Sequence, residues 1–159
     1  MSIVLKDVTD VIDNYSGLSR KTLEYGLVTK SIVAGAAKEP GFSVDSWAPL
    51  ADLIAVDDFV RVGNFKEVMN WTDYVGFLTA WAANADWDCS FKRVTEVGNI
   101  VFLELEERST VGEFKSVVNS LTVYEYDDNA KIRHLDVYLQ MPLPEGDMFG
   151  SYDGVEISG

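Results

Sequence analysis

The apolar residues in the first half of the chain recur with helical spacing and predict three helices. The first is expected over residues 19–36, with Ser19 as its cap, because apolar residues share one face there: Tyr25, Val28, Ile32 and Ala36. The second begins near residue 46 and reaches about residue 54, with a proline in its first turn, where the missing N–H is tolerated. The third is expected over residues 73–85, capped by Thr72.

The second half of the chain alternates hydrophobic and polar residues with the two-residue period of β-strands. A short strand is expected just before the third helix, and four longer strands after it: residues 59–62, 87–91, 99–108, 114–126 and 131–140. A hairpin turn over residues 127–130 joins the last two strands, and Pro142 ends the final one.

Helices gathered ahead of a sheet predict the α+β class. We expect a cone-shaped α+β barrel, with three N-terminal helices packed on a strongly curved antiparallel sheet that encloses a cavity. The chain of 159 residues fits one domain. That domain is expected over residues 18–141, between an N-terminal arm (residues 1–17) and a loose C-terminal tail (residues 142–159).

The composition narrows the possible partners. Aromatic residues make up 12% of the chain, which is more than a minimal core requires and predicts a ring-lined pocket or an aromatic interface. The net charge of −13, from 26 acidic and 13 basic residues, disfavours nucleic acids and anionic membranes as partners.

Cysteine and histidine are scarce. Cys89 is the only cysteine and His134 the only histidine, which excludes an intrachain disulfide and His- or Cys-rich metal clusters, so we expect no metal and no cofactor. The N-terminal residues do not resemble a secretory signal, and no apolar run reaches the roughly 18 residues that span a bilayer. A cytoplasmic location without membrane contact is therefore expected.

Three segments carry a resemblance to a known family. Residues 47–62 run from a helix into a short strand through an Asp-Asp step, residues 127–139 form a turn followed by Lys-Ile-Arg and an aromatic strand, and Tyr124-Glu125-Tyr126 precedes that turn. Together they resemble the nuclear-transport-factor-2-like superfamily, over about residues 20–141. This superfamily includes ketosteroid isomerase, scytalone dehydratase, limonene-epoxide hydrolase and SnoaL-type cyclases, as well as proteins that only bind, so the fold does not decide the chemistry.

The resemblance also locates the catalytic positions of those enzymes. An isomerase of the ketosteroid kind would need carboxylates at the positions of Gly63 and Thr122, and both are missing. An epoxide hydrolase would need an Arg and two acids, and the corresponding positions hold Leu105, Glu107 and Val137, of which only Glu107 is suitable. The resemblance therefore favours neither of these two mechanisms.

A less standard pair remains. Arg61 lies on the first strand and Glu107 ends an apolar strand face, so we predict that Glu107 is a general acid/base assisted by Arg61. The alternatives are that Glu107 is a solvent-exposed strand-end carboxylate, and that Arg61 forms a structural ion pair with Asp57, Asp58 or Glu107.

His134 and Asp136 share one face of the last strand and are candidates for a catalytic dyad. The alternative is that both lie on the outer face, because Leu135 and Val137 form the better inward set.

Substrate contacts are expected from two elements. Ser120, Thr122 and Tyr124 share one face of the long fourth strand, and their hydroxyls are available to a ligand. Trp71 and Tyr74, at the start of the third helix, are expected to roof the cavity.

We therefore predict a small-molecule pocket protein that acts by acid/base chemistry on an apolar organic substrate, as an isomerase, dehydratase, cyclase or epoxide hydrolase. The alternative is a ligand-binding or assembly module without catalysis. Under either hypothesis we expect a homodimer formed through the outer face of the sheet.

Overall fold

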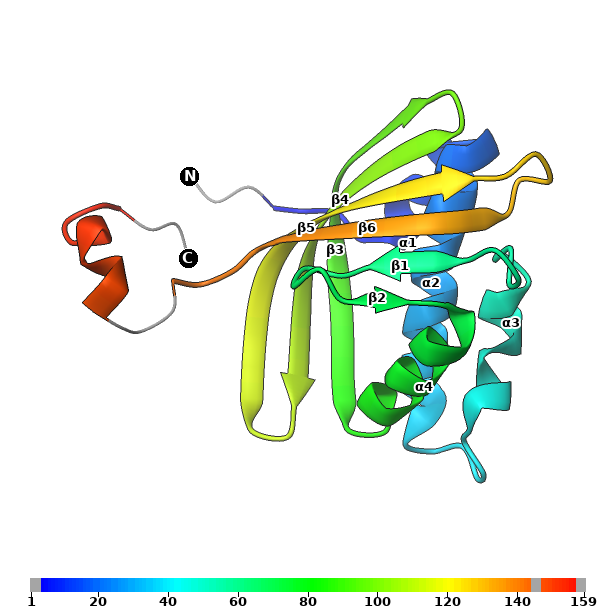
Figure 1. Cartoon of the computed structure of the whole chain (residues 1–159), viewed down its shortest axis with the longest axis horizontal. Coiled ribbons are helices and arrows are strands. Elements are labelled where there is room, and N and C mark those ends of the chain that lie inside the picture. Colours follow the sequence, from blue (N-terminus) through cyan, green and yellow to red (C-terminus); the bar gives the residue numbers. More distant parts are fainter. Residues whose placement is uncertain (1–3, 144–146, 157–159) are drawn as a thin grey trace.

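The computed structural model describes residues 4–143 and 147–156. Its helices are α1 (Val8–Val11), α2 (Gly17–Ala36), α3 (Ala48–Ala51) and α4 (Trp71–Ala82), with the 3-10 helices η1 (Ile12–Asn14), η2 (Val44–Trp47) and η3 (Asp147–Tyr152). Its strands are β1 (Val60–Val62), β2 (Val68–Met69), β3 (Ala85–Val97), β4 (Ile100–Val111), β5 (Phe114–Tyr126) and β6 (Ile132–Gln140). The predicted α+β class, with helices packed on one curved sheet, is confirmed (Figure 1).

The sheet has the strand order β2-β1-β6-β5-β4-β3. The long strands β3 to β6 form antiparallel neighbours, as predicted. The pairing of β1 with β6 is parallel, however, so the expectation of a wholly antiparallel sheet was wrong in this detail. Because β1 and β6 lie far apart in the chain, the alternation within each strand carried no information about their relative direction. β2, a strand of 2 residues, is too short to show alternation and was not predicted.

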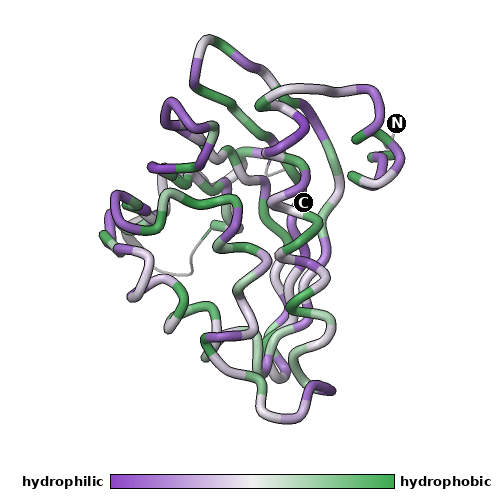
Figure 2. The backbone as a smooth tube through the Cα atoms, turned by 90° about the vertical axis from the view of Figure 1, so that its right-hand side faces the viewer, coloured by the Kyte–Doolittle hydropathy of each residue, from purple (hydrophilic) through white to green (hydrophobic). Residues whose placement is uncertain are grey.

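The strongly curved sheet wraps around helices α2, α3 and α4, which cover its concave face (Figure 1). Hydrophobic and hydrophilic residues alternate along the strands (Figure 2), so that one face of the sheet meets the helices. The core between the two layers is built from fully buried side chains of both: Leu23, Trp47, Leu50, Phe59, Val101, Leu103, Tyr126, Ile132 and Leu135.

The start of α2 is stabilised from the sheet. The helix begins at Gly17, two residues before the predicted cap, and Ser16 at its N-cap makes no side-chain capping bond. Instead, the Ser19 N–H and Ser19 Oγ both donate to Glu96 Oε1 of β3, at 2.8 Å and 2.7 Å. A remote carboxylate therefore satisfies an N-terminal amide and also complements the positive end of the helix dipole.

Two other helix boundaries differ from the prediction. The second helix is broken into η2 and α3, and Ser43 caps it through a capping box with Ser46. The third helix, α4, begins at Trp71 rather than at residue 73, because Asn70 and Asp73 form the capping box in place of Thr72. Local hydrogen bonding of short polar side chains thus determined where these helices start.

The described part of the N-terminal segment packs on the sheet. Lys6 forms an isolated antiparallel bridge with Phe91, and Val8 and Val11 of α1 are buried. At the other end of the chain, η3 lies away from the sheet (Figure 1). Within the described ranges, no helix is long and apolar enough to cross a membrane.

We predict that Glu96→Ala lowers the free energy of unfolding by about 1 kcal/mol, because the Ser19 amide at the start of α2 loses its acceptor. Urea unfolding followed by circular dichroism measures this change. Glu113→Ala, at an exposed carboxylate in the turn between β4 and β5, is the matched control and should have little effect. Equal effects of the two substitutions would contradict the assigned role of Glu96.

Candidate active site

A cavity of about 330 Å3 lies between the concave face of the sheet and helices α2 and α4. Most of its lining is apolar or aromatic, and Arg61 and Glu107 supply its charged groups. This composition is typical of sites for small organic molecules. The lining residues are Tyr25, Gly26, Thr29, Arg61, Tyr74, Phe77, Leu78, Trp81, Trp87, Leu105, Glu107, Ser109, Ser116, Val118, Thr122, Tyr124, Leu135, Val137, Leu139 and Met141.

The mouth of the cavity lies beside Phe77 and Met141. Both residues line the cavity and are 47% and 50% exposed, whereas Tyr74 and Leu135 on the inner walls are buried. An apolar ligand would therefore pass two apolar side chains on its way to the interior.

Arg61 reaches the cavity from β1. Its side chain is 14% exposed, and its Nη1 lies 3.4 Å from Glu67 Oε1 in an ion pair. The guanidinium carbon lies 5.1 Å from the ring centroid of Tyr74 and 6.0 Å from that of Phe77, within the range of cation–π attraction. An ion pair for Arg61 was anticipated, but Glu67 is its partner in place of the three carboxylates considered from the sequence: Asp57, Asp58 and Glu107.

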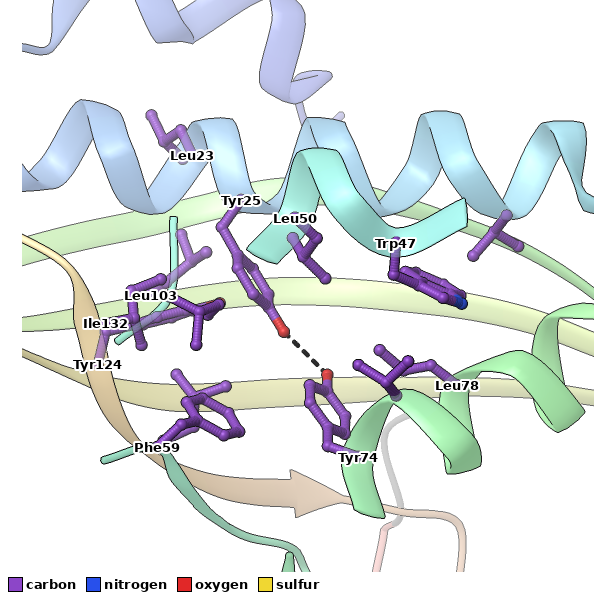
Figure 3. Packing of buried hydrophobic residues seen from close by; sticks show 14 of the residues in the cluster. Leu23, Tyr25, Trp47, Leu50, Phe59, Tyr74, Leu78, Leu103, Tyr124 and Ile132 are labelled. Carbon is purple, nitrogen blue, oxygen red and sulfur yellow. Dashed lines mark hydrogen bonds between the residues drawn. The ribbon is translucent and has the colours of Figure 1, made fainter. Parts of the chain in front are cut away.

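Two buried tyrosines from different helices meet next to Arg61. The hydroxyl oxygens of Tyr25 on α2 and Tyr74 on α4 lie 2.8 Å apart and point toward each other (Figure 3). The Tyr124 ring of β5 packs edge-on against Tyr25, with the ring centroids 5.6 Å apart. The pair therefore forms one small polar group in an aromatic surrounding.

Burial strongly affects the acidity of these phenols. It raises the pKa of Tyr25 and of Tyr124 well above the ordinary value, and neighbouring tyrosines raise both pKa values further. Burial also raises the pKa of Tyr74, but the positive charge of Arg61 and the hydrogen bond with Tyr25 act in the opposite direction. Because Arg61 favours negative charge on the Tyr74 oxygen, the favoured hydrogen bond runs from Tyr25 to Tyr74. The Tyr74 proton is then available to a ligand.

Glu107 forms a second polar group of the cavity. It lies on β4 opposite Cys89 of β3 and Val118 of β5, and its side chain is half-buried. Trp87 Nε1–H donates a hydrogen bond of 2.9 Å to Glu107 Oε1, which orients the carboxylate. Glu107 is thus a cavity residue rather than a solvated strand end.

Arg61 and Glu107 approach the cavity from different walls. Arg61 pairs with Leu135 of β6, and the pairing continues across the sheet from Leu135 to Tyr124 of β5. Tyr124 in turn pairs with Val101 of β4. Glu107 lies farther along β4, three inward-facing positions beyond Val101. No hydrogen bond or ion pair joins the two side chains within the described part of the chain.

Only some of the predicted ligand contacts line the cavity. Thr122 and Tyr124 of β5 do so. Ser120 faces the same way but is buried opposite Leu105 and is not part of the lining.

The two aromatic residues expected to roof the cavity have different positions. Tyr74 lines the cavity, whereas Trp71 does not. The Trp71 ring packs edge-on against Phe59 and Tyr74, at centroid distances of 5.6 Å and 6.1 Å. Trp71 therefore supports Tyr74 from behind and does not form the roof.

His134 and Asp136 form their predicted contact outside the cavity. His134 Nε2 lies 3.0 Å from Asp136 Oδ1. Because neighbouring strand residues alternate in direction and Leu135 and Val137 line the cavity, His134 and Asp136 lie on the outer face of the sheet. They cannot act on a molecule bound within the cavity, which corrects their assignment to the same site as Arg61 and Glu107.

Sequence reasoning missed several cavity residues on the helices and on β3, because their patterns also fit an ordinary core. Tyr25 belongs to the apolar stripe of α2, and Trp87 to the alternation of β3. A buried phenol or indole needs a hydrogen-bond partner, and this requirement is the signal that could have identified Tyr25 and Trp87.

In the described ranges 4–143 and 147–156, no three residues among His, Cys, Asp and Glu are grouped so as to hold a metal ion.

Solved structures with a similar fold include proteins assigned to several kinds of enzyme. A protein assigned as a SnoaL-like polyketide cyclase from Jannaschia sp. CCS1 superposes with a TM-score of 0.57 at 12% identity, over 79% of this chain and 90% of that protein. An LEH-like epoxide hydrolase from M. tuberculosis gives a TM-score of 0.53 at 14% identity, over 72% and 84%. A protein assigned as a ketosteroid isomerase from Kribbella flavida DSM 17836 gives 0.51 at 16% identity, over 83% and 90%.

The chain has the nuclear-transport-factor-2-like fold. At these identities the likeness concerns the fold alone. No protein-family model matches the sequence, and no curated protein matches it.

Within the nuclear-transport-factor-2-like fold, the positions assigned from the resemblance to catalytic groups hold uncharged residues here, except for Glu107. Leu105, Thr122 and Val137 line the cavity, whereas Gly63 is buried beside it and is not part of its lining. The charged residues that line this cavity are therefore Glu107 and Arg61, and the tyrosine pair lies beside Arg61.

The hydrogen bond between Tyr25 and Tyr74 should be measurable as a coupling energy. Tyr25→Phe or Tyr74→Phe alone leaves one hydroxyl without its partner and should cost about 1 kcal/mol of unfolding free energy. The double variant should lose less than the sum, because both partners are removed together. Urea unfolding of the wild type, the two single variants and the double variant gives the coupling energy. Additive losses of unfolding free energy would argue against the hydrogen bond.

The raised tyrosine pKa values also predict alkaline sensitivity. Above about pH 10 the unfolded chain ionises its phenols, while Tyr25 and Tyr124 stay protonated in the folded protein. The folded state then binds more protons, so stability is full below about pH 10 and falls as the pH rises above it. Urea unfolding at increasing pH should show this slope, and Tyr124→Phe should make it shallower. Identical slopes in the two proteins would contradict this account.

Proposed function

We propose that this protein is a cofactor-independent acid/base enzyme that removes a proton next to a carbonyl group of a small, mainly apolar molecule. The observation that carries the proposal is that one apolar cavity holds a carboxylate, Glu107, on one wall and the donors Arg61 and Tyr74 on another. A base and an oxyanion site on separate walls suit a substrate whose acidic C–H and carbonyl oxygen lie on different atoms.

The steps follow from this arrangement. The carbonyl oxygen accepts a hydrogen bond from the Tyr74 hydroxyl, whose oxygen lies 2.8 Å from that of Tyr25. Glu107, oriented by Trp87, takes the proton from the neighbouring carbon, and the negative charge moves to the oxygen beside Arg61. When the substrate has a C=C bond conjugated with the enolate, Glu107 returns the proton to a different carbon of that system, which gives an isomerisation. When the enolate carbon instead attacks a second carbonyl of the same molecule, a C–C bond forms and Glu107 returns the proton to the resulting alkoxide oxygen, which gives a cyclisation.

The similar structures support this choice of substrate class. Two of them bear the names of a polyketide cyclase and a ketosteroid isomerase, and both names denote reactions of ketones. The epoxide hydrolase is a weaker precedent, because Leu105 and Val137 replace two of the polar groups expected for that reaction.

The second candidate is a binding protein without catalysis. Its support is the apolar character of three cavity positions, Leu105, Val137 and Leu139, which would hold a ligand without reacting with it. Native mass spectrometry of the purified protein would identify a ligand that copurifies in either case.

The test of catalysis does not require a known product. The protein is incubated in D2O with a panel of enones and lactones, and loss of the protons next to each carbonyl is followed by NMR. We expect accelerated exchange for at least one carbonyl compound, and a loss of about 10²–10⁴-fold in Glu107→Gln, because the general base is removed.

Glu106→Gln is the matched control. Glu106 is the adjacent residue of β4, points to the outer face and pairs with Arg108 at 2.9 Å, so exchange should be unchanged. Binding of a carbonyl compound without accelerated exchange would favour the binding protein. Equal activity of Glu107→Gln and the wild type would remove Glu107 from the mechanism.

A further inference from the structure

Gly63 leaves a space next to Arg61 that another residue occupies. A Cβ atom built on Gly63 would overlap Oε1 and Cδ of Glu67 and would lie 2.8 Å from Arg61 Nη1. Gly63 itself is buried. The carboxylate of Glu67 therefore fills the volume that a side chain at position 63 would take, directly beside the guanidinium.

The turn between β1 and β2 holds this carboxylate in place. The Gly63 N–H donates to the Glu67 carbonyl at 2.8 Å, and the Lys66 N–H donates to the Gly63 carbonyl at 2.9 Å. Lys66 adopts a positive φ of 65°, which allows the tight return of the chain. Glu67 Oε2 accepts from the Phe65 N–H at 2.9 Å, which leaves Oε1 for Arg61.

Several interactions thus keep the Glu67 carboxylate ionised. Its pKa is lowered overall, because the backbone N–H groups of Glu67 and Phe65 and the charge of Arg61 outweigh the opposing effect of burial. The hydrogen bonds come from the turn itself, so the carboxylate has a fixed place that does not depend on Arg61.

Arg61 needs such a partner. Its side chain is 14% exposed and passes over Tyr74 and Phe77, and an arginine side chain has many rotamers. A partly buried guanidinium without a counter-ion would turn toward solvent. Glu67 is the carboxylate that pairs with it within the described residues.

We propose that Glu67 is a positioning residue, whose carboxylate, placed in the gap at Gly63, fixes the Arg61 guanidinium over Tyr74 in the cavity. Glu67 does not line the cavity and acts through Arg61. The placement of Arg61 is independent of the function proposed above, whereas its effect on turnover rests on that function.

The placement is tested directly by NMR of the arginine side chains in the full-length, ¹⁵N-labelled protein. The chain has 5 arginines, and the Arg61 Nε–H signal is assigned by its absence in Arg61→Lys. In the wild type this signal should be shifted and protected from exchange with water. In Glu67→Gln it should move to the position of a free arginine side chain, and in the control Glu113→Gln it should not change.

Gly63→Ala tests the gap itself. The added methyl group should displace the Glu67 carboxylate and release the Arg61 signal, as Glu67→Gln does. In the Glu67→Gly background, Gly63→Ala should destabilise the protein less than it does in the wild type, because the overlap with the Glu67 carboxylate is gone and only the close approach to Arg61 Nη1 remains. If Gly63→Ala does not fold, the Arg61 signal in the isosteric variant Glu67→Gln tests whether Glu67 fixes Arg61. An Arg61 signal that stays shifted and protected in Glu67→Gln would overturn the proposal.

The effect on turnover is tested with the proton-exchange assay. Glu67→Gln should lower kcat about tenfold with little change in KM, because the cation is misplaced while the apolar contacts with the substrate remain. In the Arg61→Gln background, Glu67→Gln should cause no further loss. A further loss of equal size would show that Glu67 does not act through Arg61. If no carbonyl compound is turned over but the Arg61 signal responds to Glu67→Gln, the proposed reaction fails and the positioning role stands.

Discussion

The short parallel ladder between β1 and β6 is the constraint on which the site depends. It pairs Val60 with His134 and Arg61 with Leu135, and Ala55 and Leu53 extend it through backbone hydrogen bonds with Ile132 of 2.9 Å each. Because strand side chains alternate in direction, this register points Arg61 into the cavity and Val60 outward. A shift of one residue would reverse both. The ladder also joins the first half of the chain to the last strand, so the cavity closes only when both halves have folded.

The cavity combines apolar walls with polar groups, and each of these polar groups is held in place by a partner residue. Tyr25 holds Tyr74, Trp87 holds Glu107, and Glu67 holds Arg61. In the described residues, no buried side-chain nitrogen or oxygen lacks a hydrogen-bond partner. Buried polar groups that are paired in this way keep a defined geometry without a ligand, which limits the reorganisation needed during a reaction.

The periodic pattern of the sequence was sufficient to predict the helices and strands with clear periodicity. It also predicted which face of the sheet each strand residue takes. The alternation of β4 predicted that Glu107 shares a face with Leu105, and the alternation of β6 correctly favoured Leu135 and Val137 as inward residues. These inferences use only short-range geometry, which repeats regularly along a strand.

Contacts between distant segments could not be obtained in this way. The acceptor for the start of α2 comes from β3, more than 70 residues away in the chain, and such a relation has no periodic signal. The partner of Arg61 is close in the sequence, but it precedes a strand of 2 residues that is too short to show alternation, so no pattern indicated that the chain turns back there. The tyrosine pair joins two helices for the same reason, although the need of a buried phenol for a partner made Tyr25 and Tyr74 detectable in principle.

The turn that carries Glu67 has a second attachment. Asn64 accepts a hydrogen bond from the Leu139 N–H at 3.0 Å and donates to Met141 Sδ at 3.5 Å, and Met141 lies at the mouth of the cavity. The turn between β1 and β2 therefore contacts Met141 at the mouth of the cavity and also carries Glu67, the counter-ion of Arg61. The entrance and the charge at the inner wall are mechanically linked, so a ligand that moves Met141 on entering would also act on the position of Arg61.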